Sequence, residues 1–181
     1  SEMCIRDRCK TCDGKGKIRR QKTIEISVPA GIDDDQILNV GGKGNAGSNG
    51  GPNGDLHVYI TVRPHAIFTR RGNDVWCDMP ITFTQAALGA EVTVPTLDGK
   101  VSYTVHEGTQ PGDVFKLKGK GIQSINGRGR GDQYVRVTVE VPKNLSKRQK
   151  ELLQEFEQNA DEKNYQKRKS FFGKIKDLFE D

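Results

Sequence analysis

The feature that most constrains this sequence is an internal repeat with a period of 77 residues. Val28–Val62 aligns with Val105–Val139 without a gap, and twelve of the 35 aligned positions hold the same residue. The shared residues are mostly turn formers: a leading glycine, a Gly-Lys-Gly triplet and a Gly-Asp pair, at Gly31/Gly108, Gly42–Gly44/Gly119–Gly121 and Gly54–Asp55/Gly131–Asp132. The sequence therefore predicts two copies of one structural unit.

Both copies predict β-structure. Leu56–Val62 and Gln133–Val139 alternate between apolar and polar residues with period two, which is typical of half-buried strands. In each copy we also expect a strand that runs up to the leading glycine, and a short apolar strand that precedes a Gly-Lys-Gly turn. Between the copies, Glu91–Val94 and Lys100–Val105 flank Leu97-Asp98-Gly99, and an Asp-Gly step between alternating runs predicts a hairpin.

The composition changes after Pro142, where helical patterns replace alternation. Ser146 is suited to cap a helix over Lys147–Gln158, and we expect the polar stretch Asn159–Lys169 that follows to be mobile. The tail then places five apolar side chains on one side of a second helix, namely Phe171, Phe172, Ile175, Leu178 and Phe179. This stripe can dock on the neighbouring β-domain or on a second copy of the chain, and the sequence leaves both interpretations open.

The charge distribution bears on the choice of partner. The formal charge is +5, and residues 1–22 carry all of it, with eight Lys/Arg against three acids, so the rest of the chain is neutral. Folded nucleic-acid binders usually carry a basic face across the domain. A mean hydropathy of −0.70 without a long apolar run predicts no membrane span, and without a signal-peptide pattern we expect the cytoplasm. No hydrolase, metalloprotease or phosphate-loop motif is present, so we expect no enzyme.

A cysteine motif lies in the basic segment. Cys9 and Cys12 stand in a C-x-x-C-x-G-x-G pattern, which can supply two ligands to a zinc ion. A closed structural site needs four ligands, so the pattern predicts half a zinc site. A redox function fits less well, because the glycines after Cys12 disfavour the helix that such a motif needs. Cys77 beside Trp76 is expected in a core. A zinc-knuckle nucleic-acid-binding fragment is the alternative function, and its affinity would fall steeply with salt.

Several motifs occur in an order that resembles the bacterial DnaJ family, of the type with a cysteine-rich zinc region. The resemblance runs from Cys9 to the C-terminus and leaves out Ser1–Arg8. Its landmarks are Cys9–Gly16, Val28–Gly31, Gly50–Pro52, Gly54–Leu56, Arg63–Phe68, Ala86–Gly89, Val94–Lys100, Gly108–Gln110 and Gly119–Gly121.

The resemblance implies a mostly β fold of two tandem β-sandwich-like domains with an internal repeat, followed by a C-terminal helical dimerisation segment. The domains would be a remnant of the zinc region (9–16), a first, client-binding β-domain (17–79), a second β-domain (80–143) and a helical dimerisation tail (144–181). It also implies a homodimeric chaperone of protein folding and the stress response. In the family, unfolded polypeptide adds along a sheet edge of the first domain and places an apolar side chain in a pocket. Ile24 and Phe68 match the pocket positions, although residue patterns alone favour core packing for both.

The sequence departs from the family pattern in its zinc region, its J-domain and the strands of its first β-domain. Only the last of the family's four cysteine repeats is present, and in the family it shares its zinc with the first. The sequence contains no His-Pro-Asp tripeptide of a J-domain, so we expect stimulation of a DnaK-type ATPase from the full-length parent only. The strands that precede the zinc region in the family are also missing, and we expect an incomplete first domain.

Overall fold

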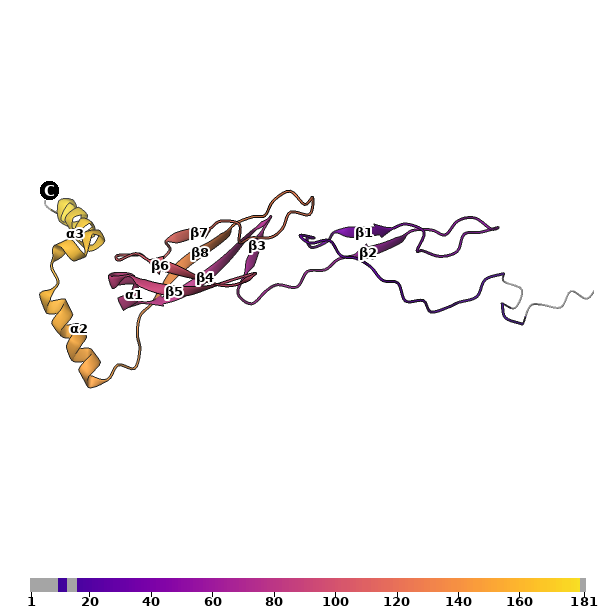
Figure 1. The fold of residues 1–181 in the computed structure, drawn as a ribbon. Coiled ribbons are helices and arrows are strands. Elements are labelled where there is room, and N and C mark those ends of the chain that lie inside the picture. Colours follow the sequence, from indigo (N-terminus) through magenta and orange to yellow (C-terminus); the bar gives the residue numbers. More distant parts are fainter. Residues whose placement is uncertain (1–9, 13–15, 180–181) are drawn as a thin grey trace, which may run out of the picture. The chain divides into compact units, whose positions relative to one another are not determined.

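The computed structural model describes residues 10–12 and 16–179. Strands make up most of its regular structure, and helices close the chain, which confirms the predicted fold class (Figure 1). The elements are β1 (Ile37–Val40), β2 (Leu56–Tyr59), β3 (Thr69–Arg71), β4 (Asp74–Thr82), α1 (Phe83–Leu88), β5 (Ala90–Thr96), β6 (Gly99–Val105), β7 (Val114–Leu117), β8 (Gln133–Glu140), α2 (Lys147–Asn159), the 3-10 turn η1 (Glu162–Asn164) and α3 (Gln166–Phe179).

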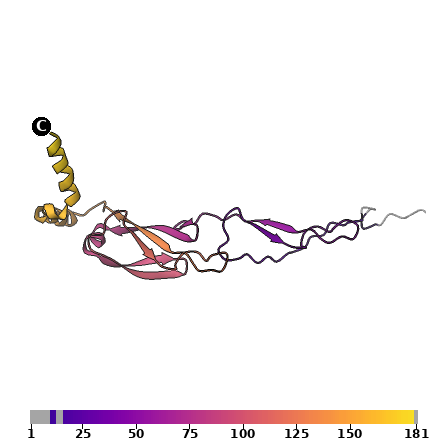
Figure 2. The same ribbon diagram turned by 90° about the horizontal axis from the view of Figure 1, so that it is seen from above.

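The strands form three sheets. β1 pairs with β2 in a two-stranded antiparallel sheet, and the two strands lie side by side in both views of the ribbon (Figure 2). β5 and β6 form the predicted hairpin, paired from Ala90–Val105 to Thr96–Gly99. The remaining strands form a four-stranded sheet in the order β3-β4-β8-β7.

Two compact units divide these elements: Ser1–Cys77 with Lys116–Tyr134, and Asp78–Phe115 with Val135–Asp181. The loop between β7 and β8 thus belongs to the first unit although it lies in the second repeat. The domain boundaries inferred from the sequence stay predictions.

The two repeat copies use the same hydrogen bonds around the Gly-Lys-Gly turn. In the first copy the backbone N–H of Gly42 donates to Asp55 Oδ1 at 2.9 Å, and in the second the N–H of Gly119 donates to Asp132 Oδ1 at 2.7 Å. The Gly119 N–H bond is the main reason why the pKa of Asp132 lies below its ordinary value. The Gly-Asp pair is therefore repeated because its carboxylate closes the turn.

The strand pairing is repeated as well. Asp35 N–H donates to the Ile60 carbonyl at 3.1 Å, and at the positions 77 residues later Gly112 N–H donates to the Val137 carbonyl at 2.8 Å. Asp35 has a positive φ of 57° and Gly112 one of 90°, so both copies turn into their short strand through the same backbone conformation. The sequence repeat is thus a structural repeat.

The buried apolar side chains lie in the second repeat copy and in β4, α1 and β5. Val135 and Val137 of β8 are at most 1% exposed, whereas their counterparts Val58 and Ile60 in the first copy are only half-buried. The difference follows from the sheets, because β8 lies between β4 and β7 while β2 pairs with β1 alone among the described strands. Cys77 is 4% exposed, which confirms its predicted place in a core.

The strand predicted to run up to Gly31 in the first copy is absent, since residues 17–29 are not in a strand. Its counterpart in the second copy is β6, which the short hairpin turn holds against β5. Residues 17–29 have no strand partner in the described chain, and without one an isolated strand has no hydrogen bonds to hold it. β2 also ends at Tyr59, before the predicted Val62.

The helical tail begins as predicted. Ser146 caps α2 in a capping box with Gln149. The polar stretch Asn159–Lys169 holds η1 and the start of α3, and its mobility stays a prediction. Asp161 accounts for η1, because its side chain accepts the backbone N–H of Lys163 at 2.7 Å and starts the 3-10 turn. None of the helices among the described residues is long and apolar enough to cross a membrane.

Candidate functional site

The two side chains predicted to form a client pocket are each half-buried. Phe68 is held by a compact turn, in which the Nδ1 of His65 accepts the backbone N–H groups of Ile67 and Phe68 at 3.0 and 3.3 Å. The His65 and Phe68 rings lie 5.1 Å apart. Ile24 lies in the segment without regular structure. Neither Ile24 nor Phe68 lines either of the two cavities described below, so the pocket that they would share stays a prediction.

Apolar side chains remain exposed around the β1–β2 sheet. Tyr59 is 75% and Ile37 is 52% exposed, and these two residues face each other across the pair. Val28, Val62 and Ile67 in the neighbouring sequence are also exposed. In the described chain both β1 and β2 have one edge without a strand partner. An open sheet edge beside apolar side chains is a surface on which another extended chain can pair.

The zinc motif is only partly described. Cys12 is half-exposed, and Cys9 lies outside the described residues. Within residues 10–12 and 16–179, no three His, Cys, Asp or Glu side chains gather as metal ligands. Zinc binding by Cys9 and Cys12 therefore stays a prediction.

The predicted apolar stripe of the tail lies on α3 and is exposed. The exposed fractions are 60% for Phe171, 56% for Phe172, 74% for Leu178 and 82% for Phe179, and Ile175 is half-buried. In contrast, Phe156 of α2 contacts the ring of Phe83 in α1, with ring centres 6.2 Å apart. The described chain thus covers part of α2 and leaves the stripe of α3 open. A second cavity, lined in part by Tyr165 and Phe172, borders this helix.

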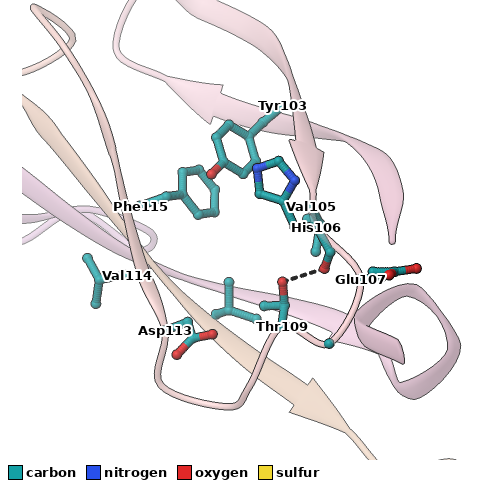
Figure 3. Close-up of a pocket in the computed structure, with 10 residues that line it drawn as sticks. Tyr103, Val105, His106, Glu107, Thr109, Asp113, Val114 and Phe115 are labelled. Carbon is teal, nitrogen blue, oxygen red and sulfur yellow. Dashed lines mark hydrogen bonds between the residues drawn. The ribbon is translucent and has the colours of Figure 1, made fainter. Parts of the chain in front are cut away.

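A cavity of about 380 Å³, which was not predicted from the sequence, lies in the second β-domain (Figure 3). Tyr103 of β6 and Phe115 of β7 form one wall, with parallel rings whose centres are 3.6 Å apart. Val105 and Val137 add apolar surface, and Asp113 places a carboxylate at the rim. The repeat could have pointed to it, because these positions match those around Ile24–Val28 and Ile37–Leu38 in the first copy.

The structure thus has two β-repeats followed by a helical tail. Its exposed apolar side chains lie beside the β1–β2 sheet and on α3. The model of the DnaJ C terminal domain matches residues 4–142, and the model of the chaperone protein DnaJ C-terminal region matches residues 148–181. The chain belongs to the DnaJ C-terminal domain family. The match begins at residue 4 and so includes part of the segment Ser1–Arg8, which we had left outside the resemblance.

Relatives support the same assignment. The chain is 58% identical to a chaperone protein DnaJ of Ruminiclostridium cellulolyticum over 185 residues, which cover 94% of this chain and 49% of the relative. It is 50% identical to a chaperone protein DnaJ of Halalkalibacterium halodurans over 175 residues, or 97% of this chain and 47% of the relative. The chain spans about half the length of the curated relatives it matches. These relatives are named as chaperone proteins.

Proposed function

We propose that this chain binds unfolded or non-native polypeptides and prevents their aggregation, as the client-binding part of a DnaJ-type co-chaperone. The observation that carries the proposal is the open edge of the β1–β2 sheet with exposed apolar side chains beside it, in a chain of this family. A folded protein has few unpaired backbone groups to offer such an edge, whereas an unfolded chain has them along its whole length.

Two kinds of contact would act together. Main-chain hydrogen bonds to the sheet edge do not depend on the client's sequence, and so suit many clients. An apolar side chain of the client would then bury against Phe68 and Ile24, which adds a modest selection for apolar segments. The turn at His65, which fixes the backbone of Phe68 and leaves the neighbouring Ile67 51% exposed, supports this role.

The remaining parts of the proposal concern partners. The exposed stripe on α3 would join two chains into a homodimer, which brings two client sites together and raises the avidity for long clients. Delivery of clients to a DnaK-type ATPase would need the J-domain of the full-length parent. We also propose that Cys9 and Cys12 hold zinc only when further ligands complete the site.

Suppression of aggregation tests the proposal. A chemically denatured model protein is diluted into buffer with and without this chain, and light scattering is recorded. We expect the intact chain to lower the scattering, and Phe68→Ala to weaken this effect. Leu88→Ala is the matched control, because Leu88 is a 76% exposed apolar residue of α1, far in sequence from Phe68. Equal losses in the two variants would contradict a specific role of Phe68, and no suppression by a folded intact chain would contradict the proposal.

A further inference from the structure

Asparagine is followed by glycine at three places in this chain, Asn49–Gly50, Asn53–Gly54 and Asn126–Gly127. The first and the last are 77 residues apart, so they occupy the same position of the two repeat copies. The backbone nitrogen after an asparagine lies within reach of the side-chain carbonyl carbon, and glycine has no side chain to hinder its approach. The three steps are therefore candidate sites for loss of the asparagine side-chain amide.

This reaction needs a glycine N–H that no other group holds. The glycine nitrogen attacks the side-chain carbonyl carbon of the asparagine, and a carbon–nitrogen bond forms between them. The bond from that carbon to the side-chain amide nitrogen breaks, and ammonia leaves with the proton of the glycine N–H. Water then opens the five-membered imide at either of its two carbonyls, which gives aspartate or isoaspartate.

Two of the three glycines use their N–H in a hydrogen bond. Gly54 N–H donates to the Asn45 carbonyl at 2.9 Å, and Gly127 N–H donates to the Ser124 carbonyl at 2.9 Å. Each of these bonds has to break before the nitrogen can attack, and this adds to the barrier of the reaction.

Gly50 differs from both. Ser48–Gly51 form a tight turn, which the Gly51 N–H closes by donating to the Ser48 carbonyl at 3.0 Å. Asn49 and Gly50 are the two central residues of this turn, and both have a positive φ, 53° and 77°, as in the two-residue turns of β-hairpins. No residue in the described part of the chain accepts the Gly50 N–H. The nitrogen is therefore available to attack Asn49.

The two equivalent steps are otherwise in similar surroundings. Asn49, Gly50, Asn126 and Gly127 are all exposed. A Cβ placed on Gly50 or on Gly127 would meet no atom within 4 Å, so neither step is crowded by its neighbours. The hydrogen bond of the glycine N–H is thus the difference that bears on the reaction.

We propose that Asn49 is a site of spontaneous deamidation, which reacts faster than its counterpart Asn126 and faster than Asn53. Lys43 is the only charged residue of the segment 41–54, so the new carboxylate cancels the net charge of this loop between β1 and β2. Isoaspartate also leads the main chain through the former side chain, which adds a methylene group to the two-residue turn. The inference does not depend on the binding of clients.

Mass spectrometry of the full chain, incubated in mildly alkaline buffer that favours loss of the amide proton, tests the inference. Peptides are sampled over time for the mass gain that comes with replacement of the amide NH2 by OH, and fragment ions assign it to each asparagine. We expect Asn49 to react about two- to ten-fold faster than Asn126 and Asn53, the range that one hydrogen bond provides. In urea the turns are lost, and the three rates should become similar because glycine follows each asparagine.

Two variants with the same substitution provide a matched comparison. Asn49→Gln lengthens the side chain, so that the reaction would have to close a six-membered ring, and it should remove most of the ammonia released early in the incubation. Asn126→Gln makes this change at the equivalent position and should remove little. Circular dichroism verifies that both variants fold.

Equal rates at Asn49 and Asn126 in the folded chain would overturn the inference, as would a faster reaction at Asn126 or at Asn53. The same order of rates in urea would also overturn it, because the local sequence and not the turn would then set the rates. None of these outcomes bears on the proposed function, which suppression of aggregation tests separately.

Discussion

Two glycines at equivalent repeat positions should respond in opposite ways to the same substitution. An alanine Cβ at Gly131 would lie 1.9 Å from the carbonyl oxygen of Asn73, whereas at Gly54 the nearest atom would be the Asn45 oxygen at 3.9 Å. The Asn73 carbonyl cannot move freely, because it accepts the backbone N–H of Ile122 at 2.7 Å. Gly131 therefore has to be glycine for reasons of space that do not apply to Gly54.

The expected loss of stability in Gly131→Ala follows from the distance by which the backbone must shift. Ordinary van der Waals contact begins at 3.4 Å, so Gly131→Ala requires a backbone shift of about 1.5 Å. Overpacking of this kind costs about 1–3 kcal/mol, and the Ile122 bond adds about 1 kcal/mol if it is lost, so we expect a loss of about 2–4 kcal/mol in the free energy of unfolding. Gly54→Ala should change it by less than about 1 kcal/mol, with a tendency to stabilise, because alanine restricts the unfolded chain.

Urea unfolding followed by tryptophan fluorescence measures both effects. Trp76 is the single tryptophan of the chain, and its ring stacks on Tyr134 with centres 4.8 Å apart, in the same unit as both glycines. Gly131→Ala should shift the midpoint strongly to lower urea, and Gly54→Ala should not. Similar midpoints for the two variants would refute the reasoning that the contact with Asn73 sets the cost.

The remaining predictions concern charge and assembly. Asp78 accepts two hydrogen bonds from Arg136, at 2.7 and 2.9 Å, and mainly these bonds hold the pKa of Asp78 below its ordinary value. The stability that the pair contributes is therefore present above about pH 4, the ordinary aspartate pKa, and is lost as the pH falls through the lowered one. Urea midpoints should fall between pH 5 and pH 3, and Asp78→Asn should reduce this fall; an unchanged fall would contradict the role of the pair. The proposed homodimer predicts that the Leu178→Lys chain, with a charge on the exposed stripe of α3, sediments as a monomer, whereas the same change at Leu88 leaves sedimentation unchanged.

Much of the β-structure could be predicted because the repeat reports on local hydrogen bonding. The Gly-Lys-Gly turn and the Gly-Asp pair recur because Asp55 and Asp132 accept the same backbone N–H in each copy. The hairpin of β5 and β6 could also be predicted from the sequence, since Asp98 and Gly99 supply the turn between two alternating runs. Both features depend on residues that are close in sequence.

Features that depend on distant partners could not be predicted. Residues 17–29 precede Gly31 as β6 precedes Gly108, but they are not in a strand, because a strand needs a partner that the pattern of one segment does not report. The stacking of Tyr103 on Phe115 joins two different sheets, and so the cavity beside it has no signature in either strand alone. The apolar stripe of the tail can be predicted from the sequence, but the surface that it packs against cannot. In the structure this stripe is exposed.

We propose above all that this chain recognises the unfolded state of other proteins. The most direct measurement compares its binding to one protein in two forms, native and permanently unfolded by reduction and alkylation of its disulfides, by isothermal titration calorimetry. We expect binding to the unfolded form only, because only that form offers unpaired backbone and apolar side chains to the open strand edges. Equal binding to both forms, or binding to neither, would contradict it.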